Sequence, residues 1–322
     1  MRVLLLGADG FIGRRVAERL LDEPDLQVTV LGRRDSADIR FDLTAGSPGA
    51  LARFLDAVAP QVVINCAGAT YGSSRTLIRS NTLAVATVCE AIRRSREPAR
   101  LVHIGSAAEY GPMPAGVPIS EHAEPRPSGP YGVSKLAGTE LVLASGLDAA
   151  VLRVFDVVGP GSPAASLFGR LAEGLRRALE QGERQVRMPD LSGYRDFVDV
   201  RDVARAVQSA AVSAATGVIN IGSGHAVRAR DGAQLLLRAA GFEGSISEDA
   251  RPAVLPGQPG PGAAGGTGGD HPPQYPPFRP GGEPVQWRQA DARTARDRLG
   301  WRTQVPLEES LGDIWLETAC RV

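Results

Sequence analysis

Cysteine, histidine and lysine are all scarce in this chain of 322 residues. Three cysteines are too few and too scattered for a disulfide framework, and the four histidines lack the spacing of metal ligands. The sequence therefore predicts neither a disulfide-stabilised fold nor a metal site. The residues concerned are Cys66, Cys89, Cys320, His103, His122, His225 and His271.

An excess of charge of either sign is also missing, since 36 basic residues face 36 acidic ones. Binding to nucleic acid or to an anionic membrane depends on clustered positive charge, so we expect neither as a partner. The apolar run at residues 3–6 breaks at Gly7 and is too short for a signal peptide or a membrane span. A cytoplasmic protein is expected.

Lysine occurs once, at position 135, and the other 35 basic residues are arginine. The two cations differ physically, because a guanidinium is a planar fork and an ammonium is a compact point charge with a tunable pKa. Lys135 is therefore a candidate for chemistry. The alternative interpretation is a residual lysine in an arginine-rich composition.

Short apolar runs alternate with amphipathic helical patterns along the first half of the chain, which is typical of a parallel sheet covered by helices. The fold class that this predicts is α/β, a Rossmann-type doubly wound parallel sheet with a smaller C-terminal substrate-binding lobe. Expected strands are 2–6, 28–31, 39–41, 62–66, 101–105, 151–155 and 218–221, and expected helices are 12–21, 50–58, 81–94, 133–144, 166–180 and 231–240.

Two units are expected from this pattern. Residues 1–165, with a return segment at about 198–224, would bind the dinucleotide, and residues 166–197 and 225–322 would form the substrate lobe. Glycine and proline dominate residues 252–284, which predicts a surface insertion that buries little side chain. A lid over the cleft is the less favoured interpretation of that insertion.

Gly7, Gly10 and Gly13 lie at the turn from the first expected strand into the first expected helix. Glycines at this point permit a tight turn, a close approach to a pyrophosphate and close packing of helix on strand. The phosphates would then lie at the positive helix end. The spacing and its context predict a dinucleotide site.

Arg33 and Arg34 follow the second expected strand, where NAD-binding folds place an acid against the adenosine 2′-hydroxyl. No carboxylate stands at the strand end itself, and two guanidiniums suit a 2′-phosphate. The sequence thus favours NADP (NADPH) over NAD. In the alternative, the arginines belong to the general arginine excess and Asp35 takes the role of the acid.

Tyr131 and Lys135 are four residues apart at the start of an expected helix, so their side chains share one face. A nearby ammonium is expected to lower the pKa of the tyrosine and make it a usable acid or base. Ser106 follows an expected strand at the edge where open α/β sheets bind ligands, and its hydroxyl can orient a carbonyl. These three residues are the candidate catalytic group.

The sequence resembles the extended short-chain dehydrogenases/reductases of the NAD-dependent epimerase/dehydratase family, and within them the group of GDP-4-keto-6-deoxymannose reductases. The stretches that carry the resemblance are GADGFIG at 7–13, GSAAEYG at 105–111, YGVSK at 131–135, RVFD at 153–156, GPG at 159–161, YRDFVDVRD at 194–202, NIGSG at 220–224 and LGW at 299–301. The resemblance implies that Phe11, Ile12, Asp42, Leu43 and Ala67 line the cofactor site with the glycines.

By the same resemblance Glu109, Asp156, Arg195 and Arg279 would contact the substrate, with the two arginines on its diphosphate. The family commonly has asparagine at position 156, and a carboxylate there would repel a diphosphate unless an arginine compensates. Alanines stand at 107 and 108, where dehydratases of the family carry an acidic pair, so dehydration is disfavoured.

The function that this resemblance implies is NADPH-dependent reduction of the C4 ketone of a nucleotide-linked 4-keto-6-deoxyhexose. The implied partners are a nucleotide sugar and a second copy of the chain in a homodimer. A nucleotide-sugar 4-epimerase needs the same three residues and is the first alternative. A non-catalytic NADP-binding sensor is the second, and it has no need of an intact Ser106, Tyr131 and Lys135.

Overall fold

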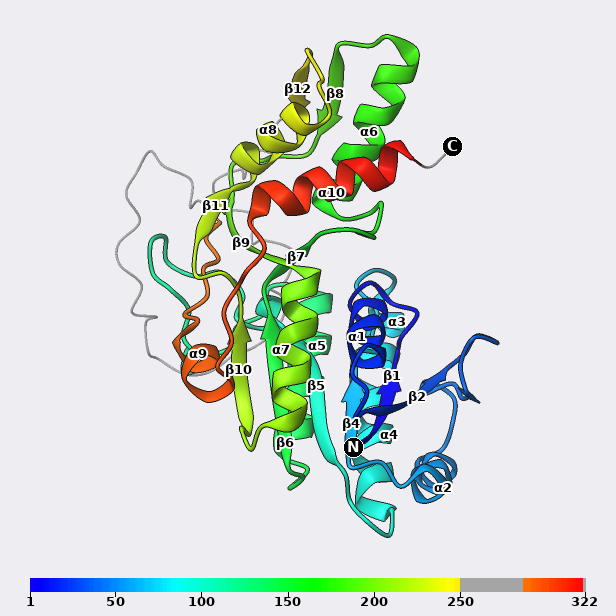
Figure 1. Ribbon diagram of the computed structural model, residues 1–322. Coiled ribbons are helices and arrows are strands. Elements are labelled where there is room, and N and C mark those ends of the chain that lie inside the picture. The colour runs from blue at the N-terminus through cyan, green and yellow to red at the C-terminus, as the bar shows by residue number, and fades with distance from the viewer. Residues whose placement is uncertain (250–285, 321–322) are drawn as a thin grey trace.

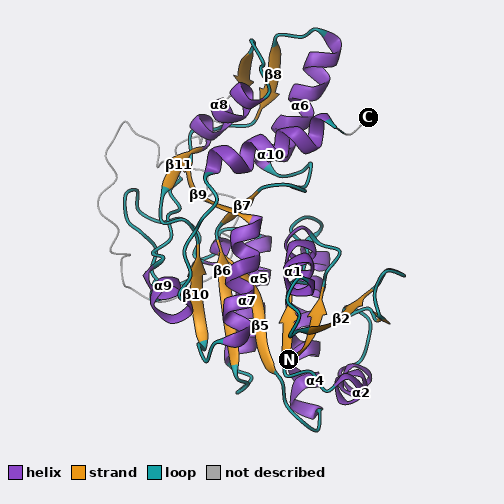
Figure 2. Cartoon of the chain, viewed as in Figure 1, coloured by secondary structure: helices purple, strands orange, loops and turns teal. Residues whose placement is uncertain are grey.

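A computed structural model describes residues 1–249 and 286–320, and this part of the chain contains a seven-stranded parallel sheet with helices on both faces (Figures 1 and 2). The strand order is β10-β6-β5-β4-β1-β2-β3, so the predicted doubly wound α/β sheet is confirmed. The strands are β1 Arg2–Leu6, β2 Gln27–Gly32, β3 Ile39–Arg40, β4 Val62–Asn65, β5 Arg100–Ser106, β6 Ala149–Val154 and β10 Gly217–Ile221.

Alternate residues of β1 enter two different hydrophobic cores, one on each face of the sheet. Val3 and Leu5 pack with α1 and α7, whereas Leu4 and Leu6 pack with α2 and α4. All four side chains are fully buried, because a central parallel strand is covered on both faces. The covering helices are α1 Phe11–Leu21, α2 Pro48–Val58, α4 Ala84–Arg94, α5 Pro130–Leu143 and α7 Val200–Val212.

The chain reverses direction across the sheet between β3 and β4. From β1 it runs outward through β2 and β3, and it then returns to place β4 on the other side of β1. At such a switch point the loops after the two neighbouring strands diverge and leave a crevice at their carboxyl ends. The glycine turn after β1 and the loop after β4 therefore face a common ligand site.

One helix begins earlier than the sequence indicated and contains an irregular turn. In place of a single helix over 81–94, the structure has α3 Ser74–Ile78, a π-helical turn Arg79–Leu83 and α4. The Ser73 hydroxyl accepts a hydrogen bond from the Thr76 amide and so caps α3. Within the π turn the buried Asn81 side chain bonds both backbone groups of Ala69. This turn anchors the loop after β4.

The carboxyl edge of the sheet carries a second group of elements, seen above the sheet in Figure 1. Its core joins three helices and short strands around residues such as Phe168, Leu236 and Ile314. The elements of this group are β7 Asp156–Val158, α6 Leu167–Gln181, β8 Gln185–Met188, β9 Tyr194–Asp199, β11 Ala226–Arg228, α8 Ala229–Ala239, β12 Ser245–Glu248 and α10 Leu307–Ala319. Helix α9 Arg293–Leu299 does not belong to it: α9 lies beside β10 and α7, and its Ala295 is buried in the core of the central sheet. Strands β7, β8, β9, β11 and β12 and helices α7, α9 and α10 were not predicted. The strands and α9 are short, and charged residues interrupt the apolar pattern of β9.

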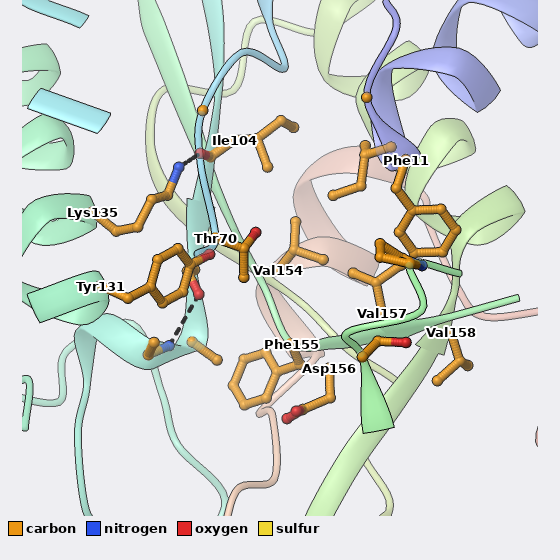
Figure 3. Close-up of a pocket in the computed structure, with 18 of the residues that line it drawn as sticks. Phe11, Thr70, Ile104, Tyr131, Lys135, Val154, Phe155, Asp156, Val157 and Val158 are labelled. Carbon is orange, nitrogen blue, oxygen red and sulfur yellow. Dashed lines mark hydrogen bonds between the residues drawn. The ribbon is translucent and has the colours of Figure 1, made fainter. Parts of the chain in front are cut away.

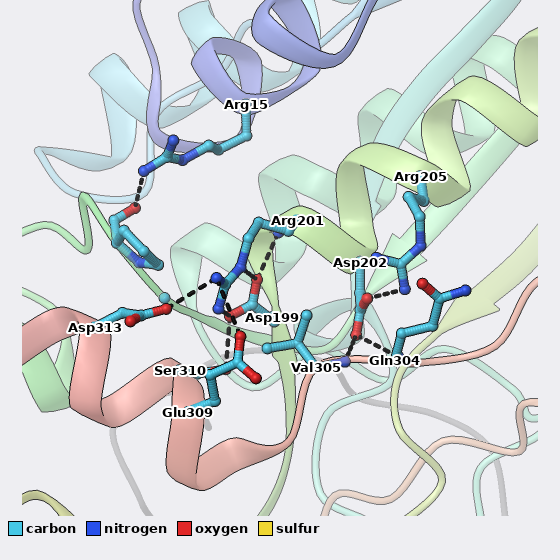
Figure 4. Close-up of polar contacts among 12 residues, drawn as sticks. Arg15, Asp199, Arg201, Asp202, Arg205, Gln304, Val305, Glu309, Ser310 and Asp313 are labelled. Carbon is cyan, nitrogen blue, oxygen red and sulfur yellow. Dashed lines mark hydrogen bonds and ion pairs between the residues drawn. The ribbon is translucent and has the colours of Figure 1, made fainter.

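A polar cluster ties α7 to α10 (Figure 4). The buried Asp199 carboxylate accepts hydrogen bonds from Ser310 on α10, at 2.6 Å, and from Arg201 on α7, at 2.9 and 3.0 Å. Arg201 also forms ion pairs with Glu309 and Asp313 of α10. The side chain of Asp199 is fully buried, so these contacts compensate for its lost hydration.

No helix in residues 1–249 and 286–320 is long and apolar enough to cross a membrane. The same described ranges contain no cluster of side chains suited to a metal ion. The expected glycine- and proline-rich insertion at 252–284 lies outside the described residues, so both interpretations of it stay predictions.

Candidate active site

The glycine turn between β1 and α1 is packed too closely for side chains. A Cβ on Gly13 would lie 2.0 Å from the carbonyl oxygen of Gly7, and a Cβ on Gly7 would lie 2.6 Å from the amide nitrogen of Ala67. Gly7 also has a φ of +79°, which L side chains rarely adopt. Gly10 is the N-cap of α1, and no side chain caps this helix. The turn thus leaves a helix N-terminus open to an anion, which fits a dinucleotide pyrophosphate.

Beside this turn lies a cavity of about 470 Å³ that extends over the carboxyl ends of β4 and β5 to β7 and α6. Figure 3 shows Tyr131 and Lys135 reaching from α5 toward the end of β5, with Phe11 on the opposite side. Most of the predicted cofactor and catalytic residues therefore meet in one place. Those that line the cavity are Gly10, Phe11, Ile12, Ala67, Ser106, Tyr131 and Lys135.

Tyr131 and Ser106 form the polar pair expected at the end of β5. Ser106 is the last residue of β5, and its hydroxyl also accepts a hydrogen bond from the Ala108 amide at 3.2 Å. Burial raises the pKa of the Tyr131 phenol, and the hydrogen bond with the Ser106 side chain acts in the opposite direction. The phenol is consequently held in its protonated form at neutral pH.

Lys135 is buried, with only 5% of the residue exposed, and its Nζ donates a hydrogen bond to the carbonyl oxygen of Ile104 at 2.5 Å. Burial lowers the pKa of this ammonium, and the carboxylate of Glu109 raises it. The expected lowering of the Tyr131 pKa is wrong for this structure, because burial of the phenol outweighs the opposing influences. Lys135 is nevertheless placed in the same cavity as Tyr131 and Ser106.

Glu109 does not line the cavity, contrary to its predicted contact with substrate. Its side chain is fully buried and forms an ion pair with Arg153 on β6, with Nε donating to Oε2 at 2.7 Å. The other oxygen accepts a hydrogen bond from the backbone amide of Ser106 at 2.7 Å. Glu109 therefore fixes the backbone that presents the Ser106 hydroxyl, and we correct its role from substrate binding to positioning.

Two arginines converge on Asp156, which lines the cavity. Arg195 from β9 donates to one carboxylate oxygen at 3.0 Å, and Arg288 lies 3.4 Å from the other. All three side chains line the cavity, so the unusual carboxylate at position 156 is compensated by two guanidiniums. Arg279, the second arginine expected there, lies outside the described residues.

Sequence reasoning missed Arg288. Its neighbour Trp287 stacks on Tyr194 of β9 with ring centroids 5.0 Å apart, and this contact places residue 288 beside Arg195. An aromatic followed by arginine was a weak signal in so arginine-rich a chain. The long-range pairing of residue 287 with β9 supplies the information that was lacking.

The adenosine end of the expected cofactor site contains a carboxylate as well as arginines. Arg34 lies after β2, and its Nε is 3.9 Å from Oδ2 of Asp9 in the glycine turn. No carboxylate stands at the end of β2 in the sequence, but Asp9 approaches it from another loop, so the preference for NADP stays a prediction. Asp42 accepts hydrogen bonds from Thr44, and Leu43 beside it is buried in the core.

Together, the open glycine turn and the cavity that holds Ser106, Tyr131 and Lys135 define a dinucleotide-dependent oxidoreductase of the short-chain dehydrogenase/reductase type. The model of the NAD-dependent epimerase/dehydratase family matches residues 3–222. The chain belongs to this family.

The names of several similar proteins describe enzymes that act on nucleotide sugars. The chain is 34% identical to dTDP-6-deoxy-L-talose 4-dehydrogenase (NAD(P)(+)) of Kitasatospora kifunensis, over 98% of this chain and 94% of that protein. It is 28% identical to GDP-6-deoxy-D-mannose reductase of Pseudomonas aeruginosa, over 82% of each chain. UDP-glucose 4-epimerases are also among the similar proteins.

Among solved structures, RMD from Pseudomonas aeruginosa complexed with NADPH is similar with a TM-score of 0.81 and 24% sequence identity. The similarity covers 100% of this chain and 99% of that one. At this identity the match supports the fold.

Proposed function

We propose that the protein reduces the C4 ketone of a nucleotide-linked 4-keto-6-deoxyhexose with NADPH. The observation that carries the proposal is a single cavity lined both by Ser106, Tyr131 and Lys135 and by Arg195 and Arg288. The first three residues suit carbonyl chemistry, and the two arginines suit a diphosphate. Relatives named as a 4-dehydrogenase and a reductase of deoxysugar nucleotides support this choice of substrate.

The roles follow from the positions of the side chains. When bound, a reduced nicotinamide would supply the hydride. The Ser106 hydroxyl orients the ketone oxygen, and the Tyr131 phenol donates its proton to that oxygen as negative charge develops there. Because the pKa of Tyr131 is raised, the phenol carries its proton at neutral pH, as reduction requires. Lys135 supplies a buried ammonium beside this group for the ribose hydroxyls.

For the cofactor, we propose that Gly7, Gly10 and Gly13 hold the pyrophosphate. Arg33 and Arg34 would favour a 2′-phosphate by charge-assisted hydrogen bonds. The proposed dinucleotide unit comprises residues 1–165 and 198–224, and the remainder, 166–197 and 225–322, forms the proposed substrate lobe.

The decisive experiment is an assay of the purified protein with NADPH and a panel of GDP- and dTDP-linked 4-keto-6-deoxy sugars. Loss of the absorbance of reduced cofactor, with a 4-hydroxy product identified by mass spectrometry, is the expected result. The Tyr131→Phe variant is the control, because it keeps the ring and removes the proton. Failure of every 4-keto sugar to oxidise NADPH would overturn the proposal.

A 4-epimerase is the second candidate, supported by the epimerases among the relatives. An epimerase would interconvert nucleotide-linked hexoses with NAD and no net change in cofactor. The same preparation, incubated with UDP-, GDP- and dTDP-hexoses, distinguishes the two by the appearance of C4 epimers.

A homodimer is also proposed. Ile78 and Leu83 on α3 and the following turn, and Val133 and Leu141 on α5, are large apolar side chains with 38–54% exposure. The two segments pack against each other, so their apolar residues lie on adjoining elements. Such a group favours burial against a second copy. Sedimentation velocity at micromolar concentration gives the mass, and a monomer would contradict the proposal.

We expect Arg288→Ala to weaken binding of a nucleoside diphosphate about tenfold or more, since a hydrogen bond from a charged group contributes about 1.5–3 kcal/mol. Calorimetry with GDP, UDP and dTDP measures this effect. Arg187→Ala is the matched control, because Arg187 pairs with Asp249 and is 81% exposed. Equal affinities of the Arg288 and Arg187 variants would remove Arg288 from the substrate site.

A further inference from the structure

Asp9 bridges two parts of the cofactor site. It belongs to the glycine turn after β1, yet its carboxylate reaches the residues that follow β2. Oδ1 accepts a hydrogen bond from the Ser36 hydroxyl at 3.3 Å, and Oδ2 lies 3.9 Å from Nε of Arg34. A Cβ on Gly32, the last residue of β2, would lie 3.8 Å from the same Oδ2.

The end of β2 is the point at which a Rossmann fold meets the adenosine ribose. A carboxylate there accepts a hydrogen bond from the 2′-hydroxyl of NAD and repels the 2′-phosphate of NADP. The side chain of Asp9 is 37% exposed, so it remains accessible to a ribose. Gly32 adds no side chain between the carboxylate and the strand end.

Asp35 is the other carboxylate near these arginines, and its geometry is different. Its side chain is 90% exposed and forms an ion pair with Arg40 at 2.9 Å. It therefore stands in solvent and already has a cationic partner. The carboxylate that approaches the end of β2 therefore comes from Asp9 in the glycine turn and not from the residues that follow the strand.

We propose that Asp9 is a specificity-determining residue that accepts the 2′-hydroxyl of NAD(H), so that the site takes both NADH and NADPH. This inference rests on the proposed function only in requiring a nicotinamide dinucleotide at the glycine turn. With NADH the carboxylate holds the ribose. With NADPH the guanidiniums of Arg33 and Arg34 bind the phosphate, and the charge of Asp9 opposes it. Asp9 therefore makes the affinities for NADH and NADPH more similar than they would be if only Arg33 and Arg34 contacted the 2′ position.

The test is a titration of the substrate-free protein with NADH and with NADPH, followed by nicotinamide fluorescence. Asp9→Asn keeps the shape and removes the charge. We expect it to weaken NADH about tenfold and to tighten NADPH, because a charged acceptor is lost for one and a repulsion is lost for the other. Asp35→Asn is the matched control and should leave the ratio of the two dissociation constants unchanged. Asp9→Ser, which also lacks the charge, should repeat the effect of Asp9→Asn.

Two fragments isolate the 2′ position from the nicotinamide. Asp9→Asn should tighten 2′,5′-ADP relative to 5′-AMP, and Arg34→Ser should do the reverse. If Asp9→Asn changes both cofactors equally, or if Asp35→Asn shifts the ratio, the assignment of Asp9 is overturned while the proposed reaction stands. If neither dinucleotide binds to the wild-type protein, the proposed function falls with it.

Discussion

Lys135→Arg is expected to leave a folded protein that has lost turnover about 10²–10⁴-fold, the range typical of a disabled acid/base step. The variant keeps a positive charge but replaces a compact ammonium with a bulky planar fork. Lys135 lines the cavity but is only 5% exposed, with Nζ on the Ile104 carbonyl, so a bulkier guanidinium would have to displace its neighbours to take the same position. The measurement is the rate of NADPH oxidation with saturating cofactor and an accepted keto sugar.

Lys135→Met separates charge from shape in this experiment. It fills a similar volume without an ammonium, and we expect an equal or larger loss of turnover. Thermal melting of both variants checks the fold. Near wild-type turnover in Lys135→Arg would show that catalysis does not require the ammonium of Lys135, and that the single lysine has no chemical significance.

Glu109→Ala is expected to lower the free energy of unfolding by about 3–5 kcal/mol, the cost of leaving one partner of a buried ion pair alone. The side chains of Glu109 and Arg153 are 0% and 3% exposed, so water cannot replace the lost contact. Urea denaturation followed by circular dichroism gives the change. Turnover should fall as well, because Glu109 also holds the backbone amide of Ser106.

Glu124→Ala is the matched control for that experiment. Glu124 forms an ion pair with Arg126 at 2.7 Å, but the two side chains are 73% and 56% exposed. Exposed pairs contribute about 0–1 kcal/mol, because water screens them. A Glu109 variant no less stable than the Glu124 variant would show that the buried pair contributes little to the fold.

The central sheet was predictable because its strands are covered on both faces. Such strands appear in the sequence as continuous apolar runs, and β1, β4 and β6 were located within one or two residues of their true ends. Strand β9 was not recognised, since Arg195 and Asp196 interrupt its apolar pattern. Asp196 is fully buried, and its partners Ser223 and Ala290 lie 27 and 94 residues further along the chain. Pairings over such separations leave no local pattern.

The three candidate catalytic residues could be predicted from the sequence, whereas the contacts of the residues around them could not. Ser106, Tyr131 and Lys135 have spacing and context that indicate their chemistry. Glu109 was predicted to contact substrate because it belongs to a motif of the family. Its ion pair with Arg153 could not be foreseen, since Arg153 lies on a different strand, 44 residues further along the chain. Likewise, nothing in the glycine turn indicates that Asp9 reaches across to Arg34. In each case the deciding fact is a contact between separate elements.

Because the chain has a single lysine, a reagent that reacts with amines can label the cavity at one defined side chain, Lys135. Apart from the chain terminus, Nζ of Lys135 is the only aliphatic amine in the sequence. Burial lowers its pKa, so more of it carries the free electron pair with which an amine attacks an electrophile. A small amine-directed reagent that enters the cavity would therefore mark one internal position. Because Lys135 lines that cavity, the extent of labelling becomes a direct gauge of whether the cavity is occupied.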